Sequence, residues 1–418
     1  MLRDPVHDLI KKDLAASAAG EQAVSSAAAA APSANAAPAV DDRVSLSVID
    51  GGWGGHSGRT PLDIHIDRYF RKWLDQPNVQ EIAINRTGEV VLWQGGIWIP
   101  HLDPAITRDV LEQLGQLVAN RSRKPFNASN VTLSTALPDG TRVEMTGPPA
   151  TLNNAIYVNL RKHEMMPFTL EQFIEQGYFK NTVHMFNMNM TDKQRAQAAK
   201  QLLLEQVQLW ELAQAGDWPE FLRNAVLEYQ NILVSGATGS GKTSFIRGLV
   251  EIIPSDERLI TVEDTPEMPL PNHPNIQALF YRRDGNETTA GGSAKEMLGA
   301  AKRKTPKRVL LAELRGDETY FYMQDVLNSG HPGGMTTTHA NSPREAFVRL
   351  ALLIKASPEG RGLGLEETLT MLHGLVGVVV QIVFKPAREK QADGRPGKGK
   401  RFCSAIYYDP MYVTTLLR

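Results

Sequence analysis

The chain has 418 residues, enough for two or three domains of about 150 residues each. Its hydrophobic fraction of 42% and charged fraction of 22% are those of an ordinary globular protein, which excludes a wholly disordered or collagen-like chain. Lys and Arg number 45 against 46 Asp and Glu, so no global basic field favours nucleic-acid binding through the phosphate backbone. The single cysteine, Cys403, excludes an internal disulfide.

Residues 1–58 are dominated by Ala, Ser, Pro and Gly and contain few large apolar side chains. Such a segment cannot bury enough apolar surface to offset the entropy lost on ordering, so we predict a disordered tail. An alanine-rich helix over residues 14–31 is the alternative. Lys11, Lys12 and Asp13 precede the alanines and polar residues interrupt them, so we expect no export signal. No run of about 20 apolar residues indicates a membrane-spanning helix.

Residues 59–165 are predicted to form a small mixed α/β domain. Asp103 and Pro104 open an amphipathic helix that runs to about residue 120, with Asp103 as its N-cap. Apolar residues at helical spacing predict another helix over 63–74. Alternating patterns predict strands over 80–85, 89–93 and 96–99, two strands flanking the turn at 138–140, and a strand over 155–161.

Residues 166–228 are predicted to be a wholly helical linker, with Thr169 and Gln172 as a capping box. We interpret its Met-rich piece, residues 184–190, as a packing patch and not as a metal site.

Residues 229–418 are predicted to form a parallel sheet covered by helices, because short apolar runs alternate with helical patterns. These runs cover residues 231–234, 258–262, 309–312, 335–338 and 378–384. Residues 385–401 carry seven basic and two acidic residues among Gly and Pro. We interpret them as a solvated loop, and a site for acidic lipid or nucleic acid is the alternative.

The strongest motif is the segment GATGSGKT, which fits the phosphate-loop pattern G-x-x-x-x-G-K-[ST]. An apolar strand precedes it and an amphipathic helix follows it, as that loop requires. The glycines let successive N–H groups converge on phosphates, Lys242 adds a cation, and the hydroxyl of Thr243 can bind Mg²⁺. The motif therefore predicts binding of ATP or GTP.

Three further polar groups follow predicted strands of the same sheet. Glu263, followed by Asp264 and Glu267, ends the second strand, and Glu313 ends the third. His339 ends the fourth strand. Because the carboxyl ends of parallel strands share one edge of a sheet, we expect these side chains near the nucleotide, where a carboxylate can orient water or bind Mg²⁺.

Four segments in one order, GATGSGKTS, ITVEDTPE, LLAELRG and SGHPGGMTTTHA, resemble the secretion traffic ATPases of the type II/type IV secretion superfamily. Within that superfamily they most resemble the cytoplasmic ATPase of type IV secretion systems. The resemblance covers residues 60–418. It implies an α/β fold with an N-terminal PAS-like domain, a helical linker and a C-terminal RecA-like domain, assembled as a homohexamer. The long linker leaves open whether the N-terminal domain packs over a neighbouring subunit.

The resemblance also implies roles for individual residues. Lys242, Glu263, Glu313 and His339 would act in catalysis, with Glu263 polarising water. Arg142 and Arg161 of the N-terminal domain would touch nucleotide phosphates, and surface ion pairs are their alternative role. Thr243 and Glu313 would bind Mg²⁺, Glu313 directly or through water. ATP would be held by Gly236, Ala237, Thr238, Gly239, Ser240, Gly241, Lys242, Thr243 and Ser244.

We therefore expect an ATP-hydrolysing motor that drives substrate transfer or pilus assembly. It would lie at the cytoplasmic face of the bacterial inner membrane and bind membrane components of a secretion channel and other secretion ATPases. Membrane association would be peripheral and mediated by partners. We expect no sequence-specific binding of nucleic acid. A pilus-retraction or type II secretion ATPase, a small-molecule kinase and a nucleotide-gated interaction module remain alternatives. The sequence leaves open whether the cargo is protein, DNA or pilin.

Overall fold

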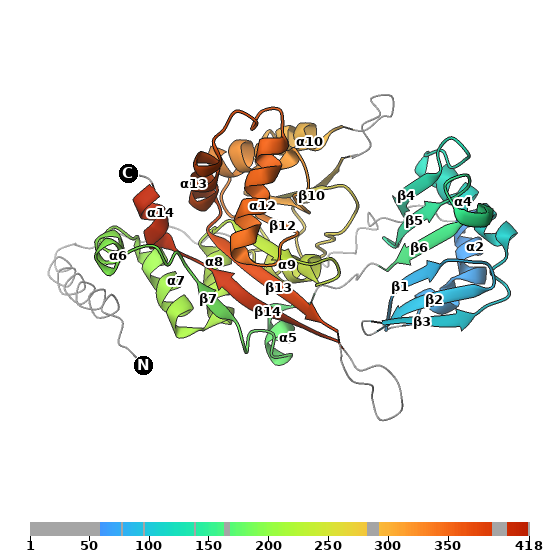
Figure 1. Ribbon diagram of the computed structural model, residues 1–418, viewed down its shortest axis with the longest axis horizontal. Coiled ribbons are helices and arrows are strands. Elements are labelled where there is room, and N and C mark those ends of the chain that lie inside the picture. The colour runs from blue at the N-terminus through green and yellow to red at the C-terminus, as the bar shows by residue number, and fades with distance from the viewer. Residues whose placement is uncertain are drawn as a thin grey trace, which may run out of the picture.

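The computed structural model contains two β-sheets, each with its own helices (Figure 1). It describes residues 59–76, 78–94, 97–137, 139–162, 168–281, 292–386 and 399–416. The predicted tail and most of the predicted basic loop lie outside these ranges. We call the described residues up to 162 the N-domain and those from 168 the C-domain.

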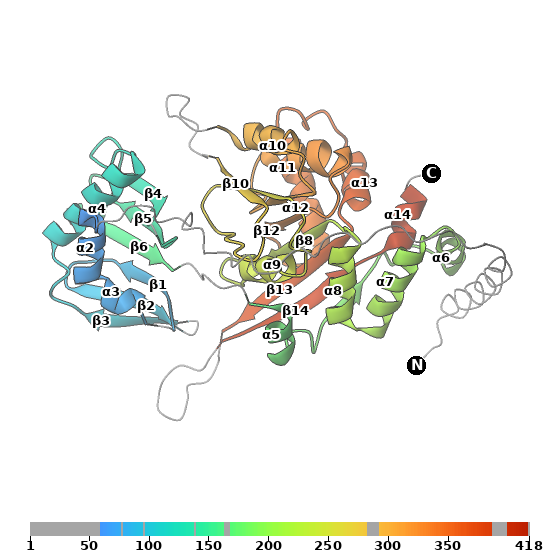
Figure 2. The ribbon, with the colours of Figure 1, turned by 180° about the vertical axis from the view of Figure 1, so that it is seen from behind.

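The N-domain is a six-stranded antiparallel sheet with the strand order β3-β2-β1-β6-β5-β4. Helices α2, α3 and α4 lie over one face of it (Figure 2) and bury a single apolar core. The mixed α/β pattern predicted for this region is therefore confirmed. Its elements are α2 Pro61–Tyr69, α3 Arg71–Leu74, β1 Val79–Ile84, β2 Glu89–Gln94, β3 Ile97–Leu102, α4 Arg108–Ser122, β4 Thr132–Ala136, β5 Arg142–Thr146, η1 Leu152–Asn154 and β6 Tyr157–Arg161.

The predicted start of α4 at Asp103 is wrong. The helix begins at Arg108, and Thr107 is its N-cap, accepting a hydrogen bond from the amide of Val110. The carboxylate of Asp103 is instead engaged by two side chains of α3: Lys72 Nζ lies 2.8 Å away, and the indole of Trp73 donates to it at 3.1 Å. Local capping preference thus yields to a tertiary contact that the local pattern does not show.

The C-domain is built on an eight-stranded sheet of order β10-β9-β11-β12-β8-β13-β14-β7. The five predicted strands are all present and parallel to one another, as expected. Strand β10 extends the parallel part, whereas β14 pairs antiparallel with β13. The strands are β7 Val183–Met185, β8 Ile232–Gly236, β9 Leu259–Glu263, β10 Ile276–Phe280, β11 Arg308–Leu311, β12 Met335–Thr338, β13 Val378–Lys385 and β14 Lys400–Tyr407.

Helices cover both faces of this sheet, so its strands are buried on both sides and read as continuous apolar runs. In β8, Ile232 and Val234 face one apolar core, whereas Leu233 faces the other. The helices and helical turns that follow β8 are α9 Lys242–Val250, α10 Ala294–Lys302, α11 Glu318–Phe321, η2 Tyr322–Val326, η3 Leu327–Ser329, α12 Pro343–Ala356, α13 Leu365–Leu375 and α14 Pro410–Leu416.

The prediction that residues 166–228 are wholly helical is wrong at one point. Helices α5 Leu170–Glu175, α6 Asp192–Ala199, α7 Leu204–Ala215 and α8 Trp218–Leu227 form, and the predicted capping box starts α5. Strand β7, however, pairs parallel with β14, where Ala405 faces Val183. Because its partner lies more than 200 residues further along the chain, local periodicity cannot reveal this strand.

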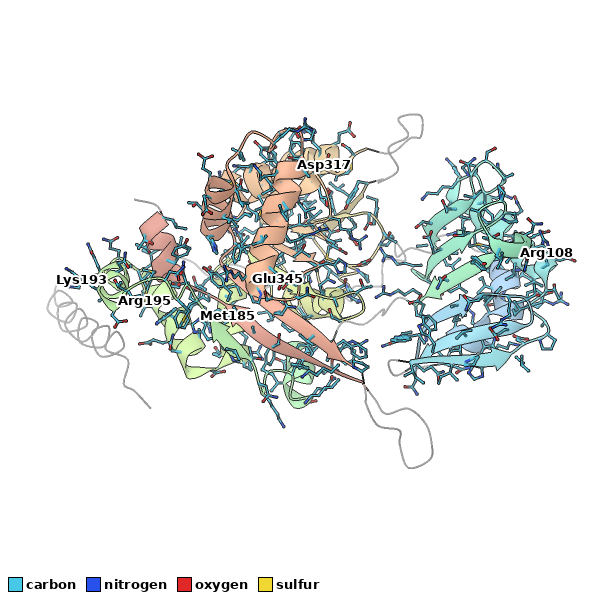
Figure 3. The ribbon with its side chains drawn as sticks, in the orientation of Figure 1. Arg108, Met185, Lys193, Arg195, Asp317 and Glu345 are labelled. Carbon is cyan, nitrogen blue, oxygen red and sulfur yellow. The ribbon has the colours of Figure 1, made fainter. Side chains whose placement is uncertain are left out.

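The same segment is tied to the end of the chain by a buried ion pair. Arg195 of α6 lies 3.2 Å from the carboxylate of Asp409, just before α14, and stacks over the ring of Phe186 at 4.7 Å (Figure 3 labels Arg195 and Met185 at this end of the sheet). Phe186 and Met190 pack against the core, whereas Met188 is exposed. The Met-rich piece is thus a packing patch in part.

Among the described residues, no helix combines the length and apolar character that crossing a bilayer requires.

Candidate nucleotide-binding site

The phosphate loop, residues 236–244, joins β8 to α9. Helix α9 begins at Lys242, and its N-cap, Gly241, has φ 97°, a left-handed conformation that favours glycine. A Cβ atom on Gly236 would lie 2.4 Å from the carbonyl oxygen of Ile382 in the neighbouring strand, so only glycine fits there. The strand, the glycine turn and the helix N-terminus thus have the arrangement that gathers N–H groups around an anion.

Lys242 is buried at the base of this loop. Its Nζ donates to the carbonyl oxygens of Gly236 at 3.0 Å and Ala237 at 3.2 Å, and lies 3.4 Å from Nδ1 of His339. Burial lowers the pKa of Lys242 to about 8. Since a bound phosphate adds negative charge beside the ammonium, it favours the protonated form and raises that pKa.

Glu313 and His339 meet at the same edge of the sheet, as predicted. His339 Nε2 lies 2.9 Å from Oε1 of Glu313. Arg315, two residues after Glu313, forms an ion pair with the other oxygen of that carboxylate. Burial opposes the charge of Glu313, but the hydrogen bond from Arg315 and the surrounding cations hold the pKa of this carboxyl below its ordinary value. Glu313 is thus an ionised carboxylate at neutral pH.

Glu263 is buried and lines no cavity beside the phosphate loop, contrary to our expectation. Its side chain is 1% exposed and accepts hydrogen bonds from Thr261 Oγ1 at 2.7 Å and from the amides of Glu267 at 2.7 Å and Met268 at 2.9 Å. Thr261 and Glu263 are two residues apart in β9 and so point to the same side, and the following loop folds back over the carboxylate. Burial raises the pKa of Glu263 against these three hydrogen bonds.

The carboxylate of Glu267 lies where we expected that of Glu263. Thr243 Oγ1 donates to Oε2 of Glu267 at 3.1 Å. Arg142 of the N-domain places Nη2 2.5 Å from Oε1 of the same carboxylate and 3.9 Å from Asp264. One side chain therefore joins the phosphate loop to the N-domain.

Arg161 lies beside Arg142 in the N-domain sheet. The two arginines are directly opposite each other on the antiparallel pair β5 and β6. Both line the same two cavities next to the phosphate loop. The predicted convergence of two N-domain arginines on this loop is thus present in the structure.

Two adjoining cavities surround the loop. The smaller, of about 100 Å³, is lined by four cationic side chains and two carboxylates, together with His339: Arg142, Arg161, Lys242, Arg315, Glu267 and Glu313. The larger, of about 440 Å³, extends between the two domains and adds aromatic side chains: Trp93, Trp98, Phe168, Phe173, Tyr178 and Phe384. Glu263 lines neither cavity. The small cavity suits phosphate and the large one suits the rest of a nucleotide.

The donors present also fit Mg²⁺ brought in with a nucleotide. The hydroxyl of Thr243 and the carboxylates of Glu267 and Glu313 line the small cavity, and these are the oxygen donors that Mg²⁺ prefers. In the described part of the chain no group of three His, Cys, Asp or Glu side chains could hold a metal alone. A magnesium ion here would therefore need phosphate oxygens and water as further ligands.

Sequence reasoning missed two of the side chains at this site. Arg315 lies inside the quoted segment LLAELRG, so its place beside Glu313 could have been inferred from that motif. Arg401 also lines the large cavity, but it was assigned to the solvated loop over 385–401, whereas the structure places Lys400 and Arg401 in β14.

Comparison with known proteins identifies the family of the chain. Residues 187–387 match the family described as "Type II/IV secretion system protein". The type IV secretion system protein VirB11 of Brucella abortus biovar 1 (strain 9-941) is 37% identical over 350 residues, which are 84% of this chain and 90% of the relative. The chain belongs to the VirB11 family. The predicted resemblance to a type IV secretion ATPase is therefore confirmed, and the chain is an ATPase of a secretion motor that binds nucleotide.

Two further comparisons are consistent with this membership. Protein VirB11 of Rhizobium radiobacter is 32% identical over 309 residues, covering 74% of this chain and 86% of the relative. The solved structure of the Legionella pneumophila ATPase DotB matches with a TM-score of 0.51 at 16% identity, over 85% of this chain and 86% of that one. At that identity the match supports the α/β fold alone.

Proposed function

We propose that this VirB11-family ATPase hydrolyses ATP in the cleft between its two domains. The observation that carries the proposal is the chain of contacts from Arg142 through Glu267 to Thr243, which links the N-domain to the phosphate loop. Both partners of that ion pair lie at the cavity that suits phosphate. A nucleotide there would touch both domains at once.

In this proposal the backbone N–H groups of residues 236–244 bind the phosphates, as in other loops of this pattern. The ammonium of Lys242 leaves the carbonyls of Gly236 and Ala237 for phosphate oxygens. Thr243 and Glu313 are the residues that hold Mg²⁺, Glu313 directly or through water. When bound with ATP, Mg²⁺ neutralises phosphate charge.

Charge and proton handling at the γ-phosphate fall to the side chains of the small cavity. Arg142 and Arg161 are placed to neutralise charge that develops in the transition state, as arginine fingers do. Glu267 is placed to orient an attacking water once Arg142 turns to the phosphate. Glu263, in contrast, acts by holding the amide of Glu267, and so positions that carboxylate.

His339 would report on the γ-phosphate. Its Nε2 faces Glu313 and its Nδ1 faces Lys242. His339 therefore lies between the residue proposed to hold Mg²⁺ and the residue proposed to bind phosphate oxygens. Burial and the charge of Lys242 lower the pKa of His339. It is therefore neutral at neutral pH and can donate one hydrogen bond and accept another.

Hydrolysis would change how the N-domain is held. With the γ-phosphate present, Arg142 and Arg161 have an anion to bind, and after its release Arg142 returns to Glu267. The two contacts compete for the same guanidinium, which is a two-state element of the kind that nucleotide switches use.

We extend the proposal to the assembly. The chain would act as a homohexamer at the cytoplasmic face of the bacterial inner membrane, together with channel components and other secretion ATPases. Support comes from its relatives, which are type IV secretion system proteins. A monomeric mass with ATP and Mg²⁺ over a wide concentration range would contradict the hexamer. Recovery of inner-membrane channel proteins in a pull-down from membranes would identify the partners.

The catalytic proposal is tested by phosphate release from ATP. The wild type should release phosphate without any added acceptor, and Lys242→Ala should bind ATP weakly and release almost none. Transfer to an acceptor in place of water would indicate a kinase. Tight ATP binding without release would indicate a nucleotide-gated module.

A further inference from the structure

Arg401 reaches the phosphate loop from a strand that carries none of the sequence motifs. It lies near the start of β14, directly opposite Phe384 in β13. Its guanidinium carbon is 4.9 Å from the centre of the Phe384 ring, and its Nε donates to the carbonyl oxygen of Gly239 at 3.2 Å. The aromatic ring and the carbonyl therefore fix the direction in which this cation points.

The guanidinium stands over the last glycine of the loop. A Cβ atom on Gly241 would lie 3.3 Å from Cδ of Arg401 and 3.7 Å from its Nε. An arginine has five N–H donors in a planar fork that matches phosphate oxygens, and the bond to Gly239 uses one of them. Arg401 is thus a pre-oriented donor group beside N–H groups that bind phosphate.

Its position along the site differs from that of Lys242, Arg142 and Arg161, which line the small cavity. Arg401 lines the large cavity but not the small one, which contains Lys242, Glu313 and His339. The small cavity is where the terminal phosphate would lie, because the lysine of this loop reaches the β- and γ-phosphates. Arg401 would therefore face the part of a bound nucleotide away from the reacting phosphate.

We propose that Arg401 is a further nucleotide-binding residue, which contacts the portion that ATP and ADP have in common. The proposal rests on nucleotide binding at the phosphate loop. A contact made equally with substrate and product adds uniform binding: it lowers KM and the Kd for ADP but does not change kcat. This distinguishes Arg401 from Arg142, which we assign to the transition state.

The test compares Arg401→Ala with the wild type by titration with ADP and by ATP turnover. Loss of a charge-assisted hydrogen bond should raise both the Kd for ADP and KM by about tenfold or more, with kcat within about twofold of wild type. Lys400→Ala is the matched control. It removes one positive charge from the adjacent, exposed residue, which does not line the cavity, and should change neither constant.

Arg401→Gln keeps part of the side chain that packs on Phe384 and serves if Arg401→Ala unfolds, with the same expected loss of ADP affinity. Unchanged ADP affinity and KM in the folded variant would overturn the proposal, and so would a fall in kcat at constant KM. A wild-type chain that does not bind ADP would instead refute nucleotide binding at this loop.

Discussion

Replacing Glu263 by Ala removes the acceptor on which the loop after β9 depends. Glu263 accepts hydrogen bonds from the amides of Glu267 and Met268, and its side chain is 1% exposed. In the variant both amides lose their partner, that of Met268 in a buried place and that of Glu267 in a partly buried one. Because the amide of Glu267 is one of them, the carboxylate that contacts Thr243 and Arg142 loses its support as well.

The magnitude follows from these contacts. A buried donor left without an acceptor costs about 1–3 kcal/mol, so two amides, one of them partly buried, give at most about 2–6 kcal/mol. Burial raises the pKa of Glu263, which shows that the native carboxylate bears a desolvation cost that the variant no longer has. We therefore expect the free energy of unfolding to fall by about 2–4 kcal/mol, and the midpoint of thermal unfolding by at least about 4 °C.

The matched variant is Glu267→Ala, which removes a carboxylate from the same loop. The carboxylate of Glu267 binds the side chains of Thr243 and Arg142, which line the cavity and can turn to water, so its loss should cost less stability than that of Glu263. The assays are thermal unfolding without nucleotide and hydrogen exchange at the amides of residues 267 and 268. A Glu263→Ala variant that keeps its melting temperature and amide protection but loses hydrolysis would refute this reasoning and return Glu263 to the role of water activator.

Three further outcomes can be measured on the same protein. Gly236→Ala should lower stability by about 3 kcal/mol and abolish ADP binding, because its Cβ would lie 2.4 Å from the backbone oxygen of Ile382. Gly239→Ala, with open space around its Cβ, should cost only about 1 kcal/mol of stability in thermal unfolding. The pKa of Lys242 is about 8 and bound phosphate raises it, so ADP binding should take up about half a proton at pH 8 and weaken as the pH rises further. Calorimetry in buffers of different ionisation enthalpy measures this uptake, and finding none between pH 7 and 9 would contradict the prediction. Burial lowers the pKa of His373 to about 4, so the unfolded state binds more protons below pH 6.5, and stability should fall by about 2–3 kcal/mol between pH 6.5 and 4.5. In urea unfolding, His373→Gln should lose this part of the pH dependence, and identical pH profiles for variant and wild type would exclude the contribution of His373.

The parts of the fold that local pattern determines were predictable. The five predicted strands of the C-domain are buried on both faces and therefore appear as apolar runs, and the capping box at Thr169 is a local signal. The phosphate loop was predictable because its glycines allow the local backbone conformation that binds phosphate. The positions of Lys242, Glu313 and His339 were predictable because each residue ends or follows a strand of one parallel sheet.

Features that depend on distant partners were not predictable in the same way. Strand β7 forms only against β14, and Asp103 is drawn from its capping role by Lys72 and Trp73. Glu263 ends its strand as predicted, but the direction of its side chain is set by the loop that folds over it. The domain boundaries at residues 58, 165 and 228 stay predictions.

The most direct test of hydrolysis between the two domains is the rate of phosphate release by Arg142→Ala at saturating ATP. Arg108→Ala is the control. Arg108 lies on the N-domain away from the C-domain (Figure 3), paired with Glu112 at 2.7 Å. A single arginine finger accelerates hydrolysis by about 10³–10⁵, and since Arg161 remains, we predict a fall of at least about 100-fold for Arg142→Ala and none for Arg108→Ala. Wild-type phosphate release by a folded Arg142→Ala variant would contradict the account.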